Sequence, residues 1–156
     1  GLIKGIAIVG DNYTAHKAFL PQMLLSAHAL YGALDLLLPL ISKEERTNKI
    51  DVVFGVVEGD VHDIGKNIVK TFLTAAGYTV HDIGKDQPAE AFVDAVREHR
   101  AQVVGLSTLM TTTMENMKAT VDVLTEEGLR KSVKIVIGGA PTSPEFAKEK
   151  APTSTP

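Results

Sequence analysis

From Ile50 onward the sequence alternates between short runs of β-branched and apolar residues and longer segments with helical periodicity. The short runs are apolar through most of their length, which is typical of parallel strands covered on both faces. The predicted strands are 52–57, 78–83, 103–107 and 134–137, and the predicted helices are 65–76, 88–100 and 113–127. Repeated strand–helix units of this length predict an α/β fold with a doubly wound parallel sheet.

The chain before Ile50 has a different pattern. Apolar residues recur at helical spacing up to about Ser42, which predicts two helices. The polar run that follows predicts a solvated linker, and the Pro- and Thr-rich end predicts a frayed tail. We therefore expect a partial helical cap of two helices over 1–45, an α/β domain over 50–150 and a disordered tail over 151–156.

Composition excludes several classes of protein. The 156 residues contain no Cys, which rules out disulfides, thiolate nucleophiles, Cys-ligated zinc and iron–sulfur clusters. The net charge is −3 with both signs interspersed, so neither a nucleic acid nor an anionic membrane is an expected partner. The longest apolar stretch is far shorter than the roughly 20 residues of a membrane span. No basic-then-apolar targeting peptide opens the sequence, so we expect a cytoplasmic protein.

A ligand site is expected beyond the carboxyl ends of the strands, where the strand order of such a sheet reverses. Three segments fall there: 58–65, 107–113 and 138–141. Each has an ordinary structural explanation, because a histidine in a loop is usually a surface residue and Asp or Thr often caps the next helix. Paired glycines can simply relieve crowding at a strand end. The combination of the three segments is what points to a ligand.

That combination is Asp60-x-His62-x-x-Gly65, Ser107-x-Leu109 and Gly138-Gly139, the three-part pattern of the B12-binding fold. The run GDVHDIGKNIV at 59–69 resembles, nearly letter for letter, the cobalamin-binding modules of methionine synthase and of methyltransferase corrinoid proteins. Segments 5–11 and 19–27 look like the last two helices of the cap that precedes this fold. The resemblance covers about residues 1–150 and implies a flavodoxin-like, Rossmann-like sheet behind a partial helical cap.

The resemblance implies a base-off/His-on cobalamin, in which a histidine replaces the cofactor's own nucleotide base below the cobalt. Carried onto this sequence, the cobalt ligand is His62, through one neutral ring nitrogen. The other ring nitrogen is expected to bond Asp60, and Asp60 in turn Ser107. Such a carboxylate fixes the tautomer of the imidazole and makes it a stronger donor to the metal. Asp60 and Ser107 are therefore expected to tune the ligand, and no residue is expected to be catalytic.

Further contacts to the cofactor follow from the same resemblance. Residues of the three loops are expected to line the nucleotide tail and the corrin ring: Gly59, Val61, Asp63, Ile64, Gly65, Thr108, Leu109, Thr111, Gly138 and Gly139. Phe19, Leu20 and Leu24 are expected to cover the upper face of the corrin and shield the methyl–cobalt bond. The alternative for these three is an ordinary place in the core of the helical bundle.

The function implied is that of a methyl carrier in one-carbon metabolism rather than a complete enzyme. Co(I) takes a methyl group from a donor bound to a substrate-specific methyltransferase, and methyl–Co(III) passes it to an acceptor methyltransferase that uses a folate or a thiol. A reductive activase is a further expected partner. Two alternatives stay open: an adenosylcobalamin-dependent isomerase subunit, and a B12- or nucleotide-binding sensory domain without methyl transfer.

The sequence departs from the family's pattern at both ends. Family members usually begin with further cap helices and continue after the fourth strand with a fifth strand and a final helix. This sequence begins inside the third cap helix and ends in Lys148-Glu149-Lys150 and a Pro/Thr/Ser tail. A fragment, a shortened member of the family, or a homodimer that completes the sheet edge would each account for the departure.

Overall fold

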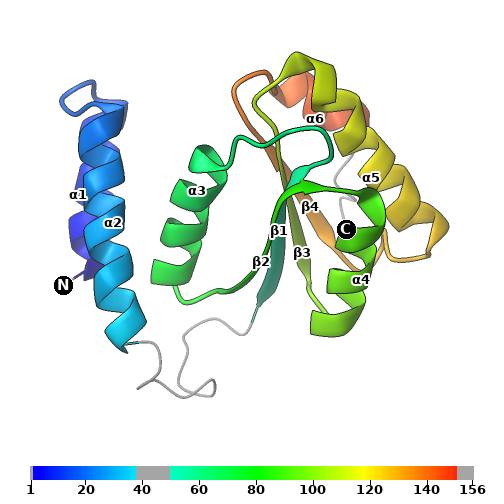
Figure 1. Cartoon of the computed structure of the whole chain (residues 1–156), viewed down its shortest axis with the longest axis horizontal. Coiled ribbons are helices and arrows are strands. Elements are labelled where there is room, and N and C mark those ends of the chain that lie inside the picture. Colours follow the sequence, from blue (N-terminus) through cyan, green and yellow to red (C-terminus); the bar gives the residue numbers. More distant parts are fainter. Residues whose placement is uncertain (1, 38–49, 151–156) are drawn as a thin grey trace. The chain divides into compact units, whose positions relative to one another are not determined.

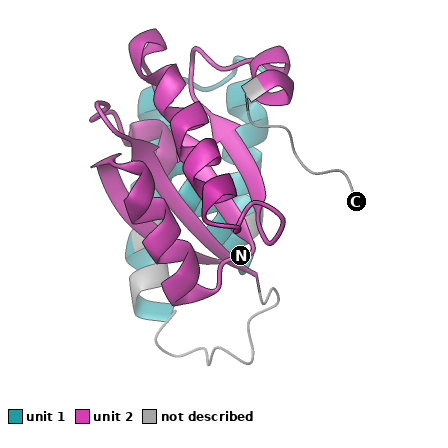
Figure 2. Ribbon diagram, turned by 90° about the vertical axis from the view of Figure 1, so that its right-hand side faces the viewer, with its two compact units in different colours: residues 1–49, 68–78 teal, residues 50–67, 79–156 magenta. Residues whose placement is uncertain are grey.

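A computed structural model describes residues 2–37 and 50–150 (Figure 1). The chain divides into two compact units, residues 1–49 with 68–78 and residues 50–67 with 79–156 (Figure 2). The predicted linker after Ser42 and the predicted tail at 151–156 lie outside the described residues. None of the described helices is both long and apolar enough to cross a membrane.

The larger unit is built on a parallel sheet of four strands, as the sequence predicts. The strands are β1 (Asp51–Val57), β2 (Thr79–Gln87), β3 (Val103–Ser107) and β4 (Lys134–Gly138). Their order in the sheet is β2-β1-β3-β4, with every pair parallel. The chain leaves β1 toward one edge and then returns to add β3 on the other side of β1. The strand order therefore reverses between β1 and β3, where such sheets bind ligands.

Three helices of the same unit build its apolar core on one side of the sheet (Figure 1). They are α4 (Ala89–His99), α5 (Met114–Glu126) and α6 (Pro144–Lys150), and a short 3-10 turn η3 (Thr111–Thr113) leads into α5. Met114, Met117, Val121 and Leu124 recur at helical spacing in α5, and the last three of them are buried. Side chains of β1 and β3 complete this core, because alternate residues of each strand point to this face.

Strand β2 is longer than the sequence predicts. Its last residues, 84–87, are Gly-Lys-Asp-Gln and lack the apolar pattern of a strand. Pairing with β1 becomes irregular here, with register shifts on both sides of Gly55. Gly84 and Asp86 both have a positive φ, at 99° and 55°. The extension therefore depends on an unusual backbone path that periodicity cannot reveal.

The smaller unit contains α1 (Leu2–Thr14), α2 (Leu20–Leu37) and most of α3 (Ile64–Ala75). Ile6, Leu30 and Ala75 form its buried core, with Val9 and Phe72 packed against them. The expected boundary after residue 45 assigned α3 wholly to the α/β domain. The structure groups 68–78 with the N-terminal helices instead, because the apolar residues Phe72 and Ala75 of α3 pack in their core.

Candidate functional site

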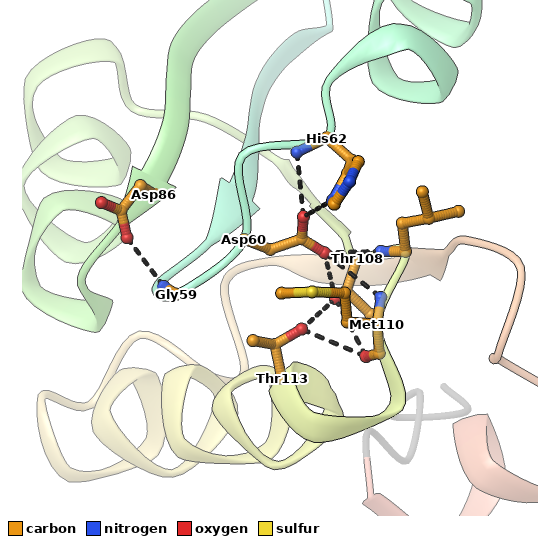
Figure 3. Close-up of polar contacts among 8 residues, drawn as sticks. Gly59, Asp60, His62, Asp86, Thr108, Met110 and Thr113 are labelled. Atoms are coloured by element: carbon orange, nitrogen blue, oxygen red, sulfur yellow. Dashed lines mark hydrogen bonds and ion pairs between the residues drawn. The ribbon is translucent and has the colours of Figure 1, made fainter.

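Two loops meet at the point where the strand order reverses. The first, 58–63, leads from β1 to α3, and the second, 108–110, leads from β3 into η3 (Figure 3). Because β1 and β3 are parallel neighbours in register, their carboxyl ends lie at the same edge of the sheet. The first loop supplies Asp60 and His62, and the second supplies the hydrogen-bond donors that hold Asp60.

Asp60 is the centre of the site and is completely buried. Its Oδ2 accepts hydrogen bonds from the hydroxyl of Thr108 at 2.7 Å and from the backbone N–H of Leu109 at 2.6 Å. Its Oδ1 accepts from the backbone N–H of His62 at 2.9 Å and lies 2.7 Å from Nδ1 of the His62 ring. Both carboxylate oxygens are therefore engaged, one by each loop (Figure 3).

The surroundings keep this carboxylate ionised. Burial by itself raises the pKa of Asp60, but the hydrogen bonds from Leu109, Thr108 and His62 outweigh that effect and hold the pKa well below its ordinary value. An ionised carboxylate can only accept hydrogen bonds. The short contact with His62 therefore requires a proton on Nδ1, and in the neutral ring the lone pair lies on Nε2.

The His62 ring is held at one nitrogen and open at the other. Its side chain is 48% exposed, and no residue in 2–37 or 50–150 forms a hydrogen bond with Nε2. The described part of the chain contains no group of three or more His, Asp or Glu residues that could hold a metal ion. A metal bound at Nε2 would therefore bring its other ligands with it, as a metal in an organic macrocycle does.

The resemblance implied Ser107 as the partner of Asp60. In the structure the hydroxyl that bonds Asp60 belongs to Thr108 instead. Ser107 is the last residue of β3 and is buried, and its side chain makes no hydrogen bond with any described residue. Thr108 lies just beyond the strand, where the chain turns toward the first loop. Its hydroxyl also contacts that of buried Thr113 at 2.5 Å, which ties Asp60 to the start of α5. The positions of Ser107 and Thr108 in the sequence do not show which of the two hydroxyls bonds Asp60.

Three glycines expected at the site differ in what an added side chain would meet. A Cβ on Gly139, whose φ is 133°, would lie 1.6 Å from the carbonyl oxygen of Thr108, so the protein itself requires glycine there. Gly65 and Gly138 have no positive φ, and an added Cβ would meet nothing within 4 Å. The protein gives no internal reason for glycine at these two positions. They leave open space next to the site, which fits the close approach of a ligand.

Two residues that the sequence analysis did not single out hold the backbone of the first loop. The carboxylate of Asp86 accepts a hydrogen bond from the N–H of Gly59 at 2.7 Å, and the N–H of Asp86 donates to the carbonyl of Asp60 at 3.0 Å. From α5, the side-chain amide of Asn116 donates to the carbonyl of Glu58 at 2.8 Å. These partners are far apart in sequence, so no local signal could have identified them.

The other residues expected to contact the cofactor differ in how far their side chains are exposed. Val61 and Leu109 on the two loops, and Ile64 at the start of α3, are large apolar residues that stay exposed. A group of exposed apolar side chains often marks a binding surface. Thr111 is exposed and Asp63 is half-buried. Phe19 and Leu20 are exposed and Leu24 is half-buried in the smaller unit, so the first two are not core residues there.

Comparison with known proteins assigns the chain to a family. Residues 50–153 and 1–38 match two models that are each described as a B12 binding domain. Dimethylamine corrinoid protein 1 of Methanosarcina acetivorans is 44% identical over 148 residues, which are 94% of this chain and 70% of the relative. A corrinoid protein of Desulfitobacterium hafniense is 45% identical over 152 residues, 96% of this chain and 70% of that protein.

Solved structures agree with this assignment. A cobalamin-binding protein from Desulfitobacterium hafniense superposes with a TM-score of 0.77 at 36% identity, over 94% of this chain and 68% of that one. The methanol:cobalamin methyltransferase complex MtaBC from Methanosarcina barkeri gives a TM-score of 0.75 at 36% identity, over 96% of this chain and 57% of the other. The chain therefore belongs to the B12-binding domain family, among the relatives of corrinoid proteins from methyltransferase systems, and its cofactor class is cobalamin or a related corrinoid.

Proposed function

We propose that this chain carries a methyl group on the cobalt of a bound corrinoid, with Nε2 of His62 as the lower axial ligand. One observation carries the proposal: Nδ1 of His62 is bonded to the buried, ionised Asp60, so the lone pair of the neutral ring lies on Nε2. A lone pair held in a fixed direction is what a metal ligand needs. The corrinoid, when bound, supplies a cobalt that can accept and release a methyl group.

The chain's own contribution is to orient and tune the imidazole. Asp60 fixes the ring through Nδ1, and Thr108 and Leu109 fix Asp60 through its other oxygen. The negative charge behind the ring would make the imidazole a stronger electron donor to a metal held at Nε2.

Binding of the cofactor with its own base displaced from cobalt is the finer part of this proposal. The space beside Gly65 and Gly138 supports it, because a nucleotide tail passing along the sheet edge needs backbone without side chains. The exposed apolar residues Val61, Ile64 and Leu109 would become covered in such a complex.

The methyl donor and acceptor would be bound by partner enzymes. Relatives of this chain carry names that refer to dimethylamine, and a similar solved structure belongs to a complex of a methanol:cobalamin methyltransferase. We propose a substrate-specific methyltransferase as one partner, an acceptor methyltransferase that uses a folate or a thiol as the second, and a reductive activase as the third. The chain would act as the carrier subunit among them.

The proposal is tested by loading the protein with cobalamin and comparing absorption spectra of the wild type, His62→Ala and His28→Ala. His28 is an exposed residue of α2 and serves as the matched control. We expect a stoichiometric red complex in which only His62→Ala shifts the bands to those of cobalamin without a lower nitrogen ligand. Identical spectra for the wild type and His62→Ala would remove His62 from this role.

A further inference from the structure

Asp86, near the end of β2, has a backbone conformation that is rare for its residue type. Its φ of 55° places it in the left-handed region, which residues other than glycine seldom adopt. Asp and Asn enter that region more readily than other residues because their short polar side chains can bond locally. Such a conformation persists only where surrounding interactions hold it. At Asp86 these interactions lead to the loop that carries His62.

Two hydrogen bonds connect Asp86 to that loop, in opposite directions. Its side-chain Oδ1 accepts from the N–H of Gly59 at 2.7 Å (Figure 3). Its own N–H donates to the carbonyl of Asp60 at 3.0 Å. Gly59 also has a left-handed backbone, with a φ of 80°. The left-handed backbone of Asp86 thus presents both its N–H and its carboxylate to the backbone of two consecutive residues of the first loop, Gly59 and Asp60.

These contacts lie immediately behind the proposed metal ligand. The backbone of Gly59 and Asp60 is fixed by Asp86, and the side chain of Asp60 is bonded directly to the His62 ring. A displacement of the Asp60 backbone would therefore move its carboxylate, and with it the imidazole. Loss of the hydrogen bond between Gly59 and Asp86 would therefore change the direction of the His62 imidazole, although every group that bonds the imidazole would still be present.

We infer that Asp86 is a positioning residue for the proposed cobalt ligand His62: its carboxylate holds the N–H of Gly59, its own N–H holds the carbonyl of Asp60, and together they keep the first loop in the place that aims His62. The inference rests on the proposed function, since it concerns the same imidazole. Among the described residues, Asp86 forms no hydrogen bond or ion pair with the imidazole of His62 or the side chain of Asp60, so its hydrogen bonds act through the backbone of the loop.

Two substitutions separate the carboxylate from the backbone conformation. Asp86→Gly suits the left-handed backbone and keeps the N–H that donates to Asp60, but it removes the acceptor for Gly59. Asp86→Asn keeps an acceptor oxygen and a residue type that tolerates this conformation. Arg100→Gly is the matched control, because Arg100 ends α4 with a similar φ of 50° and has no bond to the first loop.

The test uses the full chain labelled with the heavy isotope of nitrogen and loaded with unlabelled cobalamin reduced to its paramagnetic cobalt(II) form. In the EPR spectrum, a nitrogen from the protein splits the cobalt lines into doublets, whereas the cofactor's own base splits them into triplets. We expect doublets for the wild type, Asp86→Asn and Arg100→Gly. For Asp86→Gly we expect the equilibrium constant for imidazole coordination to fall roughly tenfold, as with other residues that support a metal ligand.

The outcomes separate the inference from the proposed function. Triplets in the wild type would overturn the proposed function, and the inference with it. Doublets of equal intensity in the wild type and Asp86→Gly would overturn the inference alone. Thermal unfolding of the cofactor-free proteins tests whether Asp86 has a purely structural role. If Asp86→Gly loses the doublets only at temperatures where it is already unfolded, the positioning role is contradicted. An equal loss of doublets in Arg100→Gly would contradict it as well.

Discussion

The ammonium group of Lys66 lies 2.6 Å from Oδ1 of Asp82, and only 2% of the Lys66 side chain is exposed. The same oxygen accepts the N–H of Gly84 at 3.0 Å, and Nζ of Lys66 also donates to the side chain of Asn67. The pair joins the first turn of α3 to β2 just before the strand becomes irregular. It therefore stabilises the backbone on which both His62 and Asp86 depend.

Replacing Lys66 by Met should destabilise the protein, because it removes the buried ammonium group that donates to the Asp82 carboxylate at 2.6 Å. Breaking a buried ion pair in this way costs about 3 kcal/mol of the free energy of unfolding. The double variant Lys66→Met/Asp82→Leu should recover part of that loss, since it removes the carboxylate that lost its contact with Lys66. Denaturant unfolding measures both, and Lys118→Met, which breaks an exposed pair with Asp122, is the control. Equal stabilities for the Lys66 and Lys118 variants would contradict this prediction.

Asp60 should make the free energy of unfolding depend on pH in the acidic range. Its pKa is depressed in the folded state, so its contribution is fully present above the ordinary value of 3.8 and is lost as the pH falls toward the folded pKa. The free energy of unfolding of the wild type should therefore decrease below about pH 4 more steeply than that of Asp60→Asn. Urea unfolding at a series of pH values measures the two slopes, and parallel curves would show that Asp60 is not held ionised.

The fold could be predicted from the sequence because its signals are local. The strands of the core show continuous apolar runs, and α5 shows a stripe that the structure buries. The end of β2 could not be predicted, because Lys85 and Asp86 carry no strand signal and the path depends on two left-handed residues. The grouping of α3 with the N-terminal helices also depends on packing between distant segments.

The same distinction applies to the site. The resemblance of the motif around Asp60 and His62 to the B12-binding family implied their pairing, and the structure contains the hydrogen bond between them. Asp86 is 27 positions from Gly59, and the contact exists only because β1 and β2 are adjacent in the sheet. The choice between Ser107 and Thr108 depends on how the chain turns after β3, which residue spacing does not specify.

That choice gives a direct comparison. Thr108→Val removes the hydroxyl that bonds the buried carboxylate of Asp60 and should lower the free energy of unfolding by about 1–3 kcal/mol. Ser107→Ala removes a hydroxyl that bonds no described residue and should cost less than about 1 kcal/mol. Denaturant unfolding of the cofactor-free proteins distinguishes the two. A larger loss of unfolding free energy for Ser107→Ala than for Thr108→Val would contradict this prediction and favour Ser107 as the partner of Asp60.

The adjacent glycines after β4 should respond differently to the same change. In Gly139→Ala the new Cβ would overlap the carbonyl of Thr108, and the φ of 133° is unfavourable for alanine, so we expect a loss of about 2–4 kcal/mol in the free energy of unfolding. In Gly138→Ala the new Cβ meets nothing within 4 Å, so stability should change by less than about 0.5 kcal/mol.

Cobalamin binding should show the opposite order for variants that remain folded. If the space beside Gly138 receives the cofactor, Gly138→Ala should weaken cobalamin binding roughly tenfold, or by about 1.4 kcal/mol, although the cofactor-free protein is unchanged. Equilibrium dialysis with cobalamin measures this affinity. Gly128→Ala is the control for a loss of stability alone, because Gly128 follows α5 away from the three loops and its φ of 72° disfavours alanine. Unchanged affinity in Gly138→Ala would mean that the open space at this glycine is not where the ligand lies. The protein itself leaves room for a side chain at Gly138. A Gly138→Ala variant that loses cobalamin affinity but keeps its stability would therefore show that the cofactor occupies this space.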